Sequence, residues 1–242
     1  MNPSKADPSA SAPARGKDHW PIFVLSLEGD EARRAPLLKS LAEMGLEAEV
    51  LIGVDGRNGL PDWAEVQVNR DVGWSLARRP YWWSMTDGEL ACALSHVLVY
   101  RKVIDEGLPG AIILEDDTLI GKPLKDFVVG RAYDKAEMVL LGHHETWVRP
   151  NSETFLCQGV NGHRLVASPV GAYGYSVSRK AAEHINAKAT PVRARADWPC
   201  DISRLESLAA DPHIVEHPAD QAAQSLLEAD RRATREEKLR SK

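Results

Sequence analysis

Three acidic residues in a row, Glu115, Asp116 and Asp117, follow a short apolar run. Adjacent carboxylates repel one another and burial raises that repulsion, so a cation or a cationic side chain is expected to neutralise them. Carboxylate oxygens are preferred ligands of hard divalent cations, which can also hold a diphosphate. The cluster therefore predicts a metal site, with Asp117 as the first ligand, Asp116 as the second, and Glu115 as a further ligand or a substrate contact. A solvated turn or a helix cap is the alternative.

The elements around these acids predict an α/β fold. Residues 111–114 form an apolar run typical of a buried strand, and ligands bind α/β sheets outside the carboxyl ends of the strands. Near the start of the chain, residues 20–27 predict a first strand and residues 47–52 a second. Between them, a helical pattern runs from Asp30, a candidate cap, to about Met44. This strand–helix–strand order indicates a mostly parallel sheet flanked by helices.

A long helix is predicted directly before the acidic strand. Thr86 and Glu89 have the spacing of a capping box, and apolar residues then recur at helical spacing up to Gly107. After the acids, His143 and His144 would point to different sides of an extended chain, which predicts a solvated loop rather than a metal pair. The other predicted elements are a short helix from 121, strands at 137–141, 170–177 and 213–216, a helix at 179–187, and a helix opened by residues 197–201.

Composition excludes several classes of protein. The 242 residues carry a net charge of −5 with a pI near 5.9, which argues against a nucleic-acid binder. The three cysteines, Cys92, Cys157 and Cys200, are widely spaced, so the pattern suggests neither a disulfide framework nor a zinc site. There is no apolar run of about 18 residues that would span a membrane. A cytoplasmic protein is expected.

Domain organisation is predicted to be simple. Residues 1–18 lack the apolar core of a signal peptide and predict a disordered leader, and residues 19–228 predict one domain. Residues 53–85 have no regular period but are rich in tryptophan and tyrosine, which would either stack on a sugar or pin the loop. Residues 229–242 form a basic tail that could contact phosphates at a membrane surface, here the inner membrane, or simply be solvated.

Taken in order, these segments resemble glycosyltransferase family 25, which includes bacterial lipooligosaccharide galactosyltransferases and a collagen-modifying branch. The likeness is carried by the order of the motifs over about 200 residues. They are the first strand with Arg33-Arg34, the Val54-Asp55-Gly56 turn, the helix with Gly88-Glu89, Cys92 and Ser95-His96, the strand ending Leu114-Glu115-Asp116-Asp117, residues 171–181, Asp197, and Pro218, Gln221 and Ser225.

The resemblance implies a GT-A-like nucleotide-binding fold and an inverting sugar transfer. The donor would be a UDP-sugar, typically UDP-galactose, and the acceptor a hydroxyl group of a glycan such as lipooligosaccharide. A divalent metal, Mn²⁺ in the first instance, would be held by the acids against both phosphates of the donor. The positive charge is needed because negative charge grows on the departing diphosphate.

Further site residues follow from the same resemblance. Arg33 or Arg34 would meet the diphosphate or form a surface pair. By analogy with other dinucleotide-binding folds, Asp55 would accept hydrogen bonds from the nucleoside. Glu89 and His96 would shape the donor pocket. Asp197 matches a family acid and would be the general base that takes the acceptor proton.

Other assignments stay open from the sequence alone. Asp201 is the reserve for the base, and Asp197 could instead cap a helix. A non-catalytic binder of nucleotide sugars or proteins on the same fold is one alternative function. A phosphohydrolase built on the pair Asp116-Asp117 is another, although such enzymes place their acids after the first strand.

Overall fold

The computed structural model describes residues 19–57, 59–64, 74–75, 79–80 and 85–218, together with Arg232 and Glu236. The predicted leader, most of the basic tail, and much of the aromatic-rich segment therefore lie outside the described residues, as do Gln221 and Ser225. The predictions made for them stay predictions. The two described tail residues are helical and exposed.

The predicted strand–helix–strand unit opens the fold. Strand β1 (Ile22–Ser26) is buried along its whole length, and β2 (Ala48–Ile52) lies parallel beside it. Helix α1 (Glu31–Glu43) connects them and buries Leu37 and Leu41, as its apolar spacing predicts. The unit is confirmed, and it fixes the direction of the sheet.

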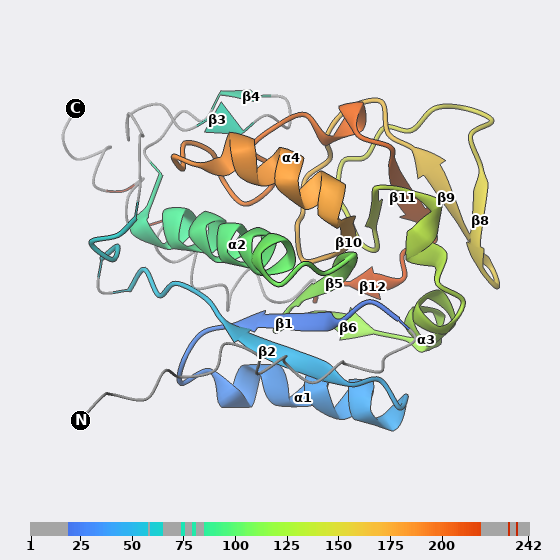
Figure 1. Ribbon diagram of the computed structural model, residues 1–242, viewed down its shortest axis with the longest axis horizontal. Helices are drawn as coiled ribbons and strands as arrows, with labels where there is room; N and C mark the ends of the chain where they lie inside the picture. The colour runs from blue at the N-terminus through green and yellow to red at the C-terminus, as the bar shows by residue number, and fades with distance from the viewer. Residues whose placement is uncertain are drawn as a thin grey trace, which may run out of the picture.

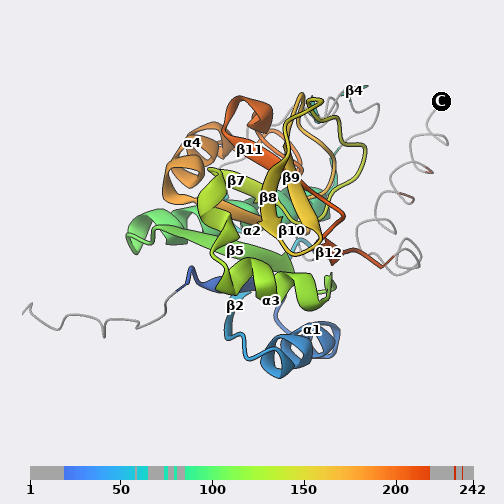
Figure 2. The same ribbon diagram turned by 90° about the vertical axis from the view of Figure 1, so that its right-hand side faces the viewer.

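An eight-stranded sheet forms the centre of the protein, in the order β2-β1-β5-β10-β7-β11-β9-β8 (Figure 1). The strands not yet described are β5 (Gly110–Glu115), β7 (Met138–Leu140), β8 (Thr154–Cys157), β9 (Val160–Arg164), β10 (Gly174–Ser178) and β11 (Ser207–Asp211). The pairings set β9 and β10 against the direction of the other six strands. The predicted α/β class with a mostly parallel sheet is confirmed. Figure 2 brings β8 and β9, at the sheet end opposite β2, toward the viewer.

Helices cover both faces of the sheet. The remaining elements are α2 (Asp87–Asp105), α3 (Lys122–Val129), α4 (Arg179–Ala189), the 3₁₀ turns η1 (Ala132–Lys135) and η2 (Ile202–Arg204), and the paired short strands β6 (Leu119–Ile120) with β12 (Val215–Glu216) and β3 (Trp74–Ser75) with β4 (Arg79–Pro80). Within the described residues, no helix is both long enough and apolar enough to cross a membrane.

Alternation along β1 divides the core into two layers. Ile22 and Val24 belong to the cluster that packs on α1 and α3, whereas Phe23 and Leu25 belong to the cluster that packs on α2 and α4. Figure 1 shows α2 and α4 together on one side of the sheet and α1 on the other. Burying each such side chain contributes about 1.5–3 kcal/mol. The doubly covered sheet explains why its strands read as continuous apolar runs.

Helix α2 is set by its first turn. The Thr86 side chain accepts a hydrogen bond from the Glu89 backbone N–H, and the Glu89 carboxylate accepts one from the Thr86 N–H, so the predicted capping box is confirmed. The helix leads from β2 to β5, which pairs with β1 on the side away from β2. Strand order therefore reverses at β1, and α1 and α2 lie on opposite faces of the sheet. A crevice is expected at the carboxyl ends of β1 and β5.

Two local predictions are wrong. Residues 197–201 do not open a long helix. Asp201 caps only the single turn η2, because the chain joins β7 as strand β11 from Ser207 onward. Asp30 stands at the N-cap position of α1, but its side chain makes no capping hydrogen bond. Its carboxylate instead lies 3.6 Å from Arg57.

The loop after β7 differs in part from its prediction. His144 is exposed, as expected for a solvated loop, and its backbone pairs with Val170. His143 is partly buried, and its ring lies 4.3 Å from that of His213, centre to centre. A solvated loop was therefore the wrong prediction for His143, because the strand that follows η2 brings His213 back across the loop.

Candidate functional site

A cleft of about 640 Å³ opens at the crevice between the strand ends. Ser26 ends β1 and Glu115 ends β5, and these two strands are direct neighbours in the sheet. The next strand, β10, runs the opposite way, so Tyr173 before its start lies at this end too, where its carbonyl accepts a hydrogen bond from the Glu115 N–H. The sheet topology thus brings three separate segments to one opening.

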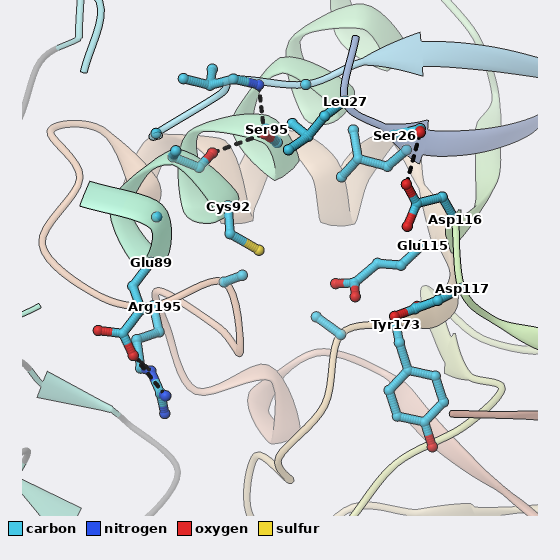
Figure 3. A pocket seen from close by; sticks show the side chains of 18 of the residues that line it. Ser26, Leu27, Glu89, Cys92, Ser95, Glu115, Asp116, Asp117, Tyr173 and Arg195 are labelled. Atoms are coloured by element: carbon cyan, nitrogen blue, oxygen red, sulfur yellow. Dashed lines mark hydrogen bonds and ion pairs between the residues drawn. The ribbon is translucent and has the colours of Figure 1, made fainter. Parts of the chain in front are cut away.

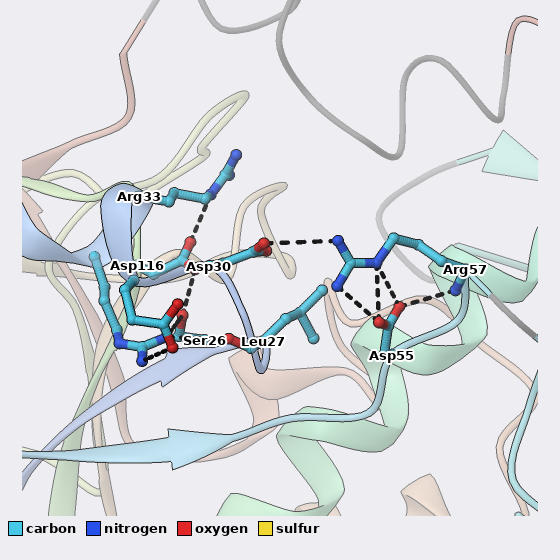
Figure 4. A network of polar contacts seen from close by, with 9 residues as sticks. Ser26, Leu27, Asp30, Arg33, Asp55, Arg57 and Asp116 are labelled. Atoms are coloured by element: carbon cyan, nitrogen blue, oxygen red, sulfur yellow. Dashed lines mark hydrogen bonds and ion pairs between the residues drawn. The ribbon is translucent and has the colours of Figure 1, made fainter.

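The adjacent acids point into a network of donors rather than into bulk water. Asp116 accepts hydrogen bonds from the Ser26 hydroxyl and from Arg33 Nε, both at 2.7 Å, as Figure 4 shows. Arg33 also donates to Asp117 through its terminal nitrogen. Burial raises the pKa of Asp116 despite the donors from Ser26 and Arg33. Arg33 therefore bridges two of the three predicted metal-site acids.

Asp117 is the most buried of these acids, with its side chain 2% exposed. One carboxylate oxygen, Oδ2, faces Arg33 and lies 3.2 Å from His217 Nε2. Burial works against the charged form, but the His217 hydrogen bond and the Arg33 charge outweigh it, so the pKa of Asp117 is lowered. The same hydrogen bond raises the pKa of His217. The other oxygen, Oδ1, is buried with no hydrogen-bond partner.

Glu115, Asp117 and His217 together match a metal-ligand set. One ligand atom from each lies within 4.8 Å of the others. Two carboxylates and an imidazole suit a divalent cation of intermediate hardness, such as Mn²⁺ or Zn²⁺. A buried carboxylate oxygen without a partner is costly, by about 1–3 kcal/mol, unless a ligand completes it. These residues therefore fit a divalent cation, with Asp116 outside the group of three and paired to Ser26 and Arg33 instead.

The opposite wall of the cleft carries a second charged network. Glu89 accepts hydrogen bonds from Arg195 at 2.8 Å, and both side chains are largely buried (Figure 3). Arg195 also lies 3.8 Å from Asp197. Glu89 thus holds the start of α2 and positions Arg195 at the same time. Its predicted role in the donor pocket would act through Arg195.

Asp197 lines the cleft from the loop before η2. Its Oδ1 accepts a hydrogen bond from the Gly171 N–H at 3.2 Å. The next residue, Trp198, has a backbone φ of 129°, a conformation that residues other than glycine rarely adopt. Its ring is buried against Tyr175. Such strain persists only where surrounding packing enforces it, and it is common at functional sites. Asp201 does not line the cleft, and its carboxylate binds the η2 turn, so the reserve assignment loses its support.

Asp55 lies at the rim of the cleft, beyond β2. Both of its oxygens accept hydrogen bonds from Arg57, which also approaches Asp30 (Figure 4). The side chain of Arg57 is 44% exposed. A nucleoside at this rim would therefore meet a preformed acid–arginine pair instead of a lone carboxylate.

His96 is placed differently from the other predicted residues. It is 1% exposed and does not line the cleft, but lies behind Glu115 with its Nε2 3.4 Å from Glu115 Oε1. Its neighbour Ser95 accepts a hydrogen bond from the Val54 N–H at 2.8 Å and holds the exit of β2 against α2. The two segments approach so closely here that a Cβ atom at position 53 would lie 2.6 Å from the Ser95 hydroxyl oxygen, which explains the glycine.

His217 and Arg195 are among the site residues that had no prediction. His217 contacts Asp117 across about 100 residues of chain, and the nearest signal was the Pro218 motif directly after it. Arg195 stands two residues before the predicted base, so a search for charge partners around Asp197 would have found it. In both cases the contact depends on how distant segments pack.

The fold and the site define an α/β protein whose acidic, arginine-bridged cleft lies at the reversal point of its sheet, the place where such folds bind nucleotides. Residues 19–201 match the family model described as "Glycosyltransferase family 25 (LPS biosynthesis protein)". Because this match spans most of the chain, the protein belongs to glycosyltransferase family 25.

Curated relatives match over shorter stretches. The inactive glycosyltransferase 25 family member 3 of Mus musculus is 35% identical over 100 residues, 40% of this chain and 16% of that protein. Procollagen galactosyltransferase 2 of Homo sapiens is 32% identical over 99 residues, 40% of this chain and 15% of that protein. Lipooligosaccharide biosynthesis protein lic2B of Haemophilus influenzae is 30% identical over 112 residues, 43% of this chain and 42% of that protein. The matches thus span about a sixth of the length of the two mammalian relatives and under half of the bacterial one.

Proposed function

We propose that this protein transfers a sugar, galactose in the first instance, from a UDP-sugar to a hydroxyl group of a glycan acceptor. A metal-assisted, inverting transfer is what the family likeness implies. The bacterial relative named for lipooligosaccharide biosynthesis and the galactosyltransferase relatives support this choice of substrates.

One observation carries the proposal: Asp117 Oδ1 is buried beside Glu115 and His217 and has no partner. Among the described residues, three carboxylates face the guanidinium of Arg33 and the imidazoles of His96 and His217, so the local charges leave room for a cation. Glu115, Asp117 and His217 would hold the ion, and His217 would give up its proton on binding. Such a cation would offset the charge that develops on the departing diphosphate.

The protein's own cations support a diphosphate at the same place. Arg33 reaches the acids from the first turn of α1, and both Asp30 and Arg33 line the cleft. The amino terminus of a helix carries partial positive charge and backbone N–H groups that favour anions. At the rim, Asp55 and Arg57 offer acceptors and donors to a nucleoside. The donor would thus lie along the carboxyl ends of β1, β2 and β5.

Asp197 is suited to the role of general base. It lies on the wall formed by the 170–173 loop and by Arg195. The Gly171 N–H fixes one oxygen, and the strained Trp198 next to it fixes the backbone. Arg195 Nη1 lies 3.8 Å from Asp197 Oδ2 and helps to hold the carboxylate that would accept the proton of the acceptor hydroxyl. Arg195 is in turn held by Glu89.

The test is release of UDP from UDP-galactose by the purified chain, with Mn²⁺ and with a chelator in its place. Release that requires the metal and rises with a glycan acceptor is the expected result. Absence of release from every sugar nucleotide tried would overturn the proposed transfer. Release that is equal in the chelator would overturn the role of the metal.

A non-catalytic sugar-nucleotide binder is the second candidate, because several relatives are named as inactive members of the same family. Calorimetry separates it from the enzyme: the binder would take up UDP-galactose without releasing UDP. A phosphohydrolase would instead release phosphate from simple phosphoesters.

A further inference from the structure

A second group of ligand-type side chains lies at the wall of the same cleft, where Cys92 and Glu115 line the opening and His96 lies behind Glu115. Cys92 and His96 are four residues apart on α2, so they lie on one face of the helix, and Glu115 approaches them from the end of β5. The Cys92 sulfur, a ring nitrogen of His96 and a Glu115 oxygen lie within 4.8 Å of one another. Figure 3 shows the Cys92 sulfur and the Glu115 carboxylate pointing into the same space.

The hydrogen bonds behind His96 orient its ring for ligation. Its Nδ1 lies 2.9 Å from the Tyr175 hydroxyl, which donates its proton to the hydroxyl of Tyr100 at 3.2 Å. Tyr175 thus holds the ring at Nδ1, and Nε2 faces Glu115 Oε1 at 3.4 Å. Without a metal, a proton shared by Nε2 and Oε1 satisfies this contact, and a cation bound by both atoms would take the place of that proton. A ligating histidine that donates its other N–H to a buried partner is the usual arrangement in metal sites.

We propose that Cys92, His96 and Glu115 form a binding site for a thiophilic divalent cation of the zinc class. Zinc bonds to nitrogen and oxygen of about 2.0–2.2 Å, at a tetrahedral angle, place those two atoms about 3.4 Å apart. This matches the separation of His96 Nε2 and Glu115 Oε1. A thiolate ligand selects zinc over manganese or magnesium. Binding transfers the Cys92 thiol proton to the buffer, and the fourth position stays open to the cleft.

This site would share Glu115 with the cation site formed by Glu115, Asp117 and His217, a consequence that rests on the proposed function. A zinc ion held by Cys92 and His96 would draw the Glu115 carboxylate away from Asp117. Zinc would therefore weaken Mn²⁺ binding in the same cleft and act as an inhibitor of transfer.

Zinc binding is tested directly on the full chain without any donor. Calorimetric titration with Zn²⁺ should show one site in the wild type, and Co²⁺ should give a thiolate charge-transfer band in the near ultraviolet. Cys92→Ala, between two alanines of α2, and the isosteric Glu115→Gln should each weaken Zn²⁺ binding about 100-fold or more, since loss of an outer partner alone costs about 10–100-fold. Cys200→Ala is the matched control, because among the described residues Cys200 belongs to neither ligand group.

The outcomes separate this proposal from the proposed function. No Zn²⁺ binding by the wild type, a cobalt band that survives Cys92→Ala, or wild-type affinity in Glu115→Gln would overturn the zinc site. Thermal melting of each variant shows that it is folded. The shared ligand is tested by electron paramagnetic resonance of Mn²⁺: Mn²⁺ affinity unchanged by stoichiometric Zn²⁺ would overturn competition. Failure of UDP release would overturn the transferase and leave zinc binding untouched.

Discussion

His143 offers a test of the structure that is independent of any ligand. Its neutral ring is satisfied on both sides, because Nε2 donates to the Ala210 carbonyl at 3.0 Å and Nδ1 accepts from the Thr146 hydroxyl at 2.5 Å. Burial, with a smaller effect of the neighbouring His213, lowers the pKa of His143 to about 4. Because burial disfavours the charged ring, His143 stays neutral in the native state until the pH falls to about 4.

The sign and size of the effect follow from the two pKa values. In the unfolded chain a histidine has a pKa of about 6.5, so between about pH 6.5 and pH 4 the unfolded state binds a proton that the native state does not. The free energy of unfolding therefore falls as the pH falls through this range. The contribution of His143 between pH 7 and pH 5 is about 2 kcal/mol, and about 3 kcal/mol once both states are protonated.

The perturbation is His143→Gln, which can still donate to the Ala210 carbonyl but does not titrate. Urea unfolding at pH 7 and pH 5 gives the loss of stability for each protein. We expect the wild type to lose about 2 kcal/mol more than His143→Gln over this interval. His184→Gln, at an exposed position of α4, is the matched control and should behave as the wild type. Equal losses in the wild type and His143→Gln would refute the buried neutral ring.

Three further predictions concern the site and the core. Asp117→Asn should weaken metal-dependent donor binding about 100-fold or more with unchanged circular dichroism, because it removes the charge of a proposed ligand; wild-type binding by calorimetry would contradict this. Asp197→Asn keeps an oxygen for the Gly171 N–H, so donor binding should persist while turnover falls about 10²-fold or more, and wild-type turnover would move the base elsewhere. Gly174→Ala would place a methyl group 2.4 Å from the buried Val215, and we expect a loss of about 1–3 kcal/mol in urea unfolding; an unchanged midpoint would show that the two strands can separate there.

Local patterns were sufficient for the elements near the start of the chain. The period of apolar residues placed β1, α1 and β2, and the spacing of Thr86 and Glu89 placed the first turn of α2. These features depend on residues a few positions apart, so the sequence contains them directly. The helix predicted from residues 197–201 is absent, because Asp201 caps a turn of only three residues before the chain returns to the sheet at β11.

The position of the site was also implied by the sequence, because carboxylates that follow a buried strand of an α/β sheet must lie at its ligand-binding edge. Which residues face those carboxylates was decided only by the tertiary structure. His217 reaches Asp117, Arg33 bridges two acids, and Cys92 meets Glu115 across the gap between α2 and β5. Such contacts join segments whose separation along the chain carries no periodic signal. They arise when the reversal of strand order at β1 and the opposed strand β10 fold these segments onto one opening.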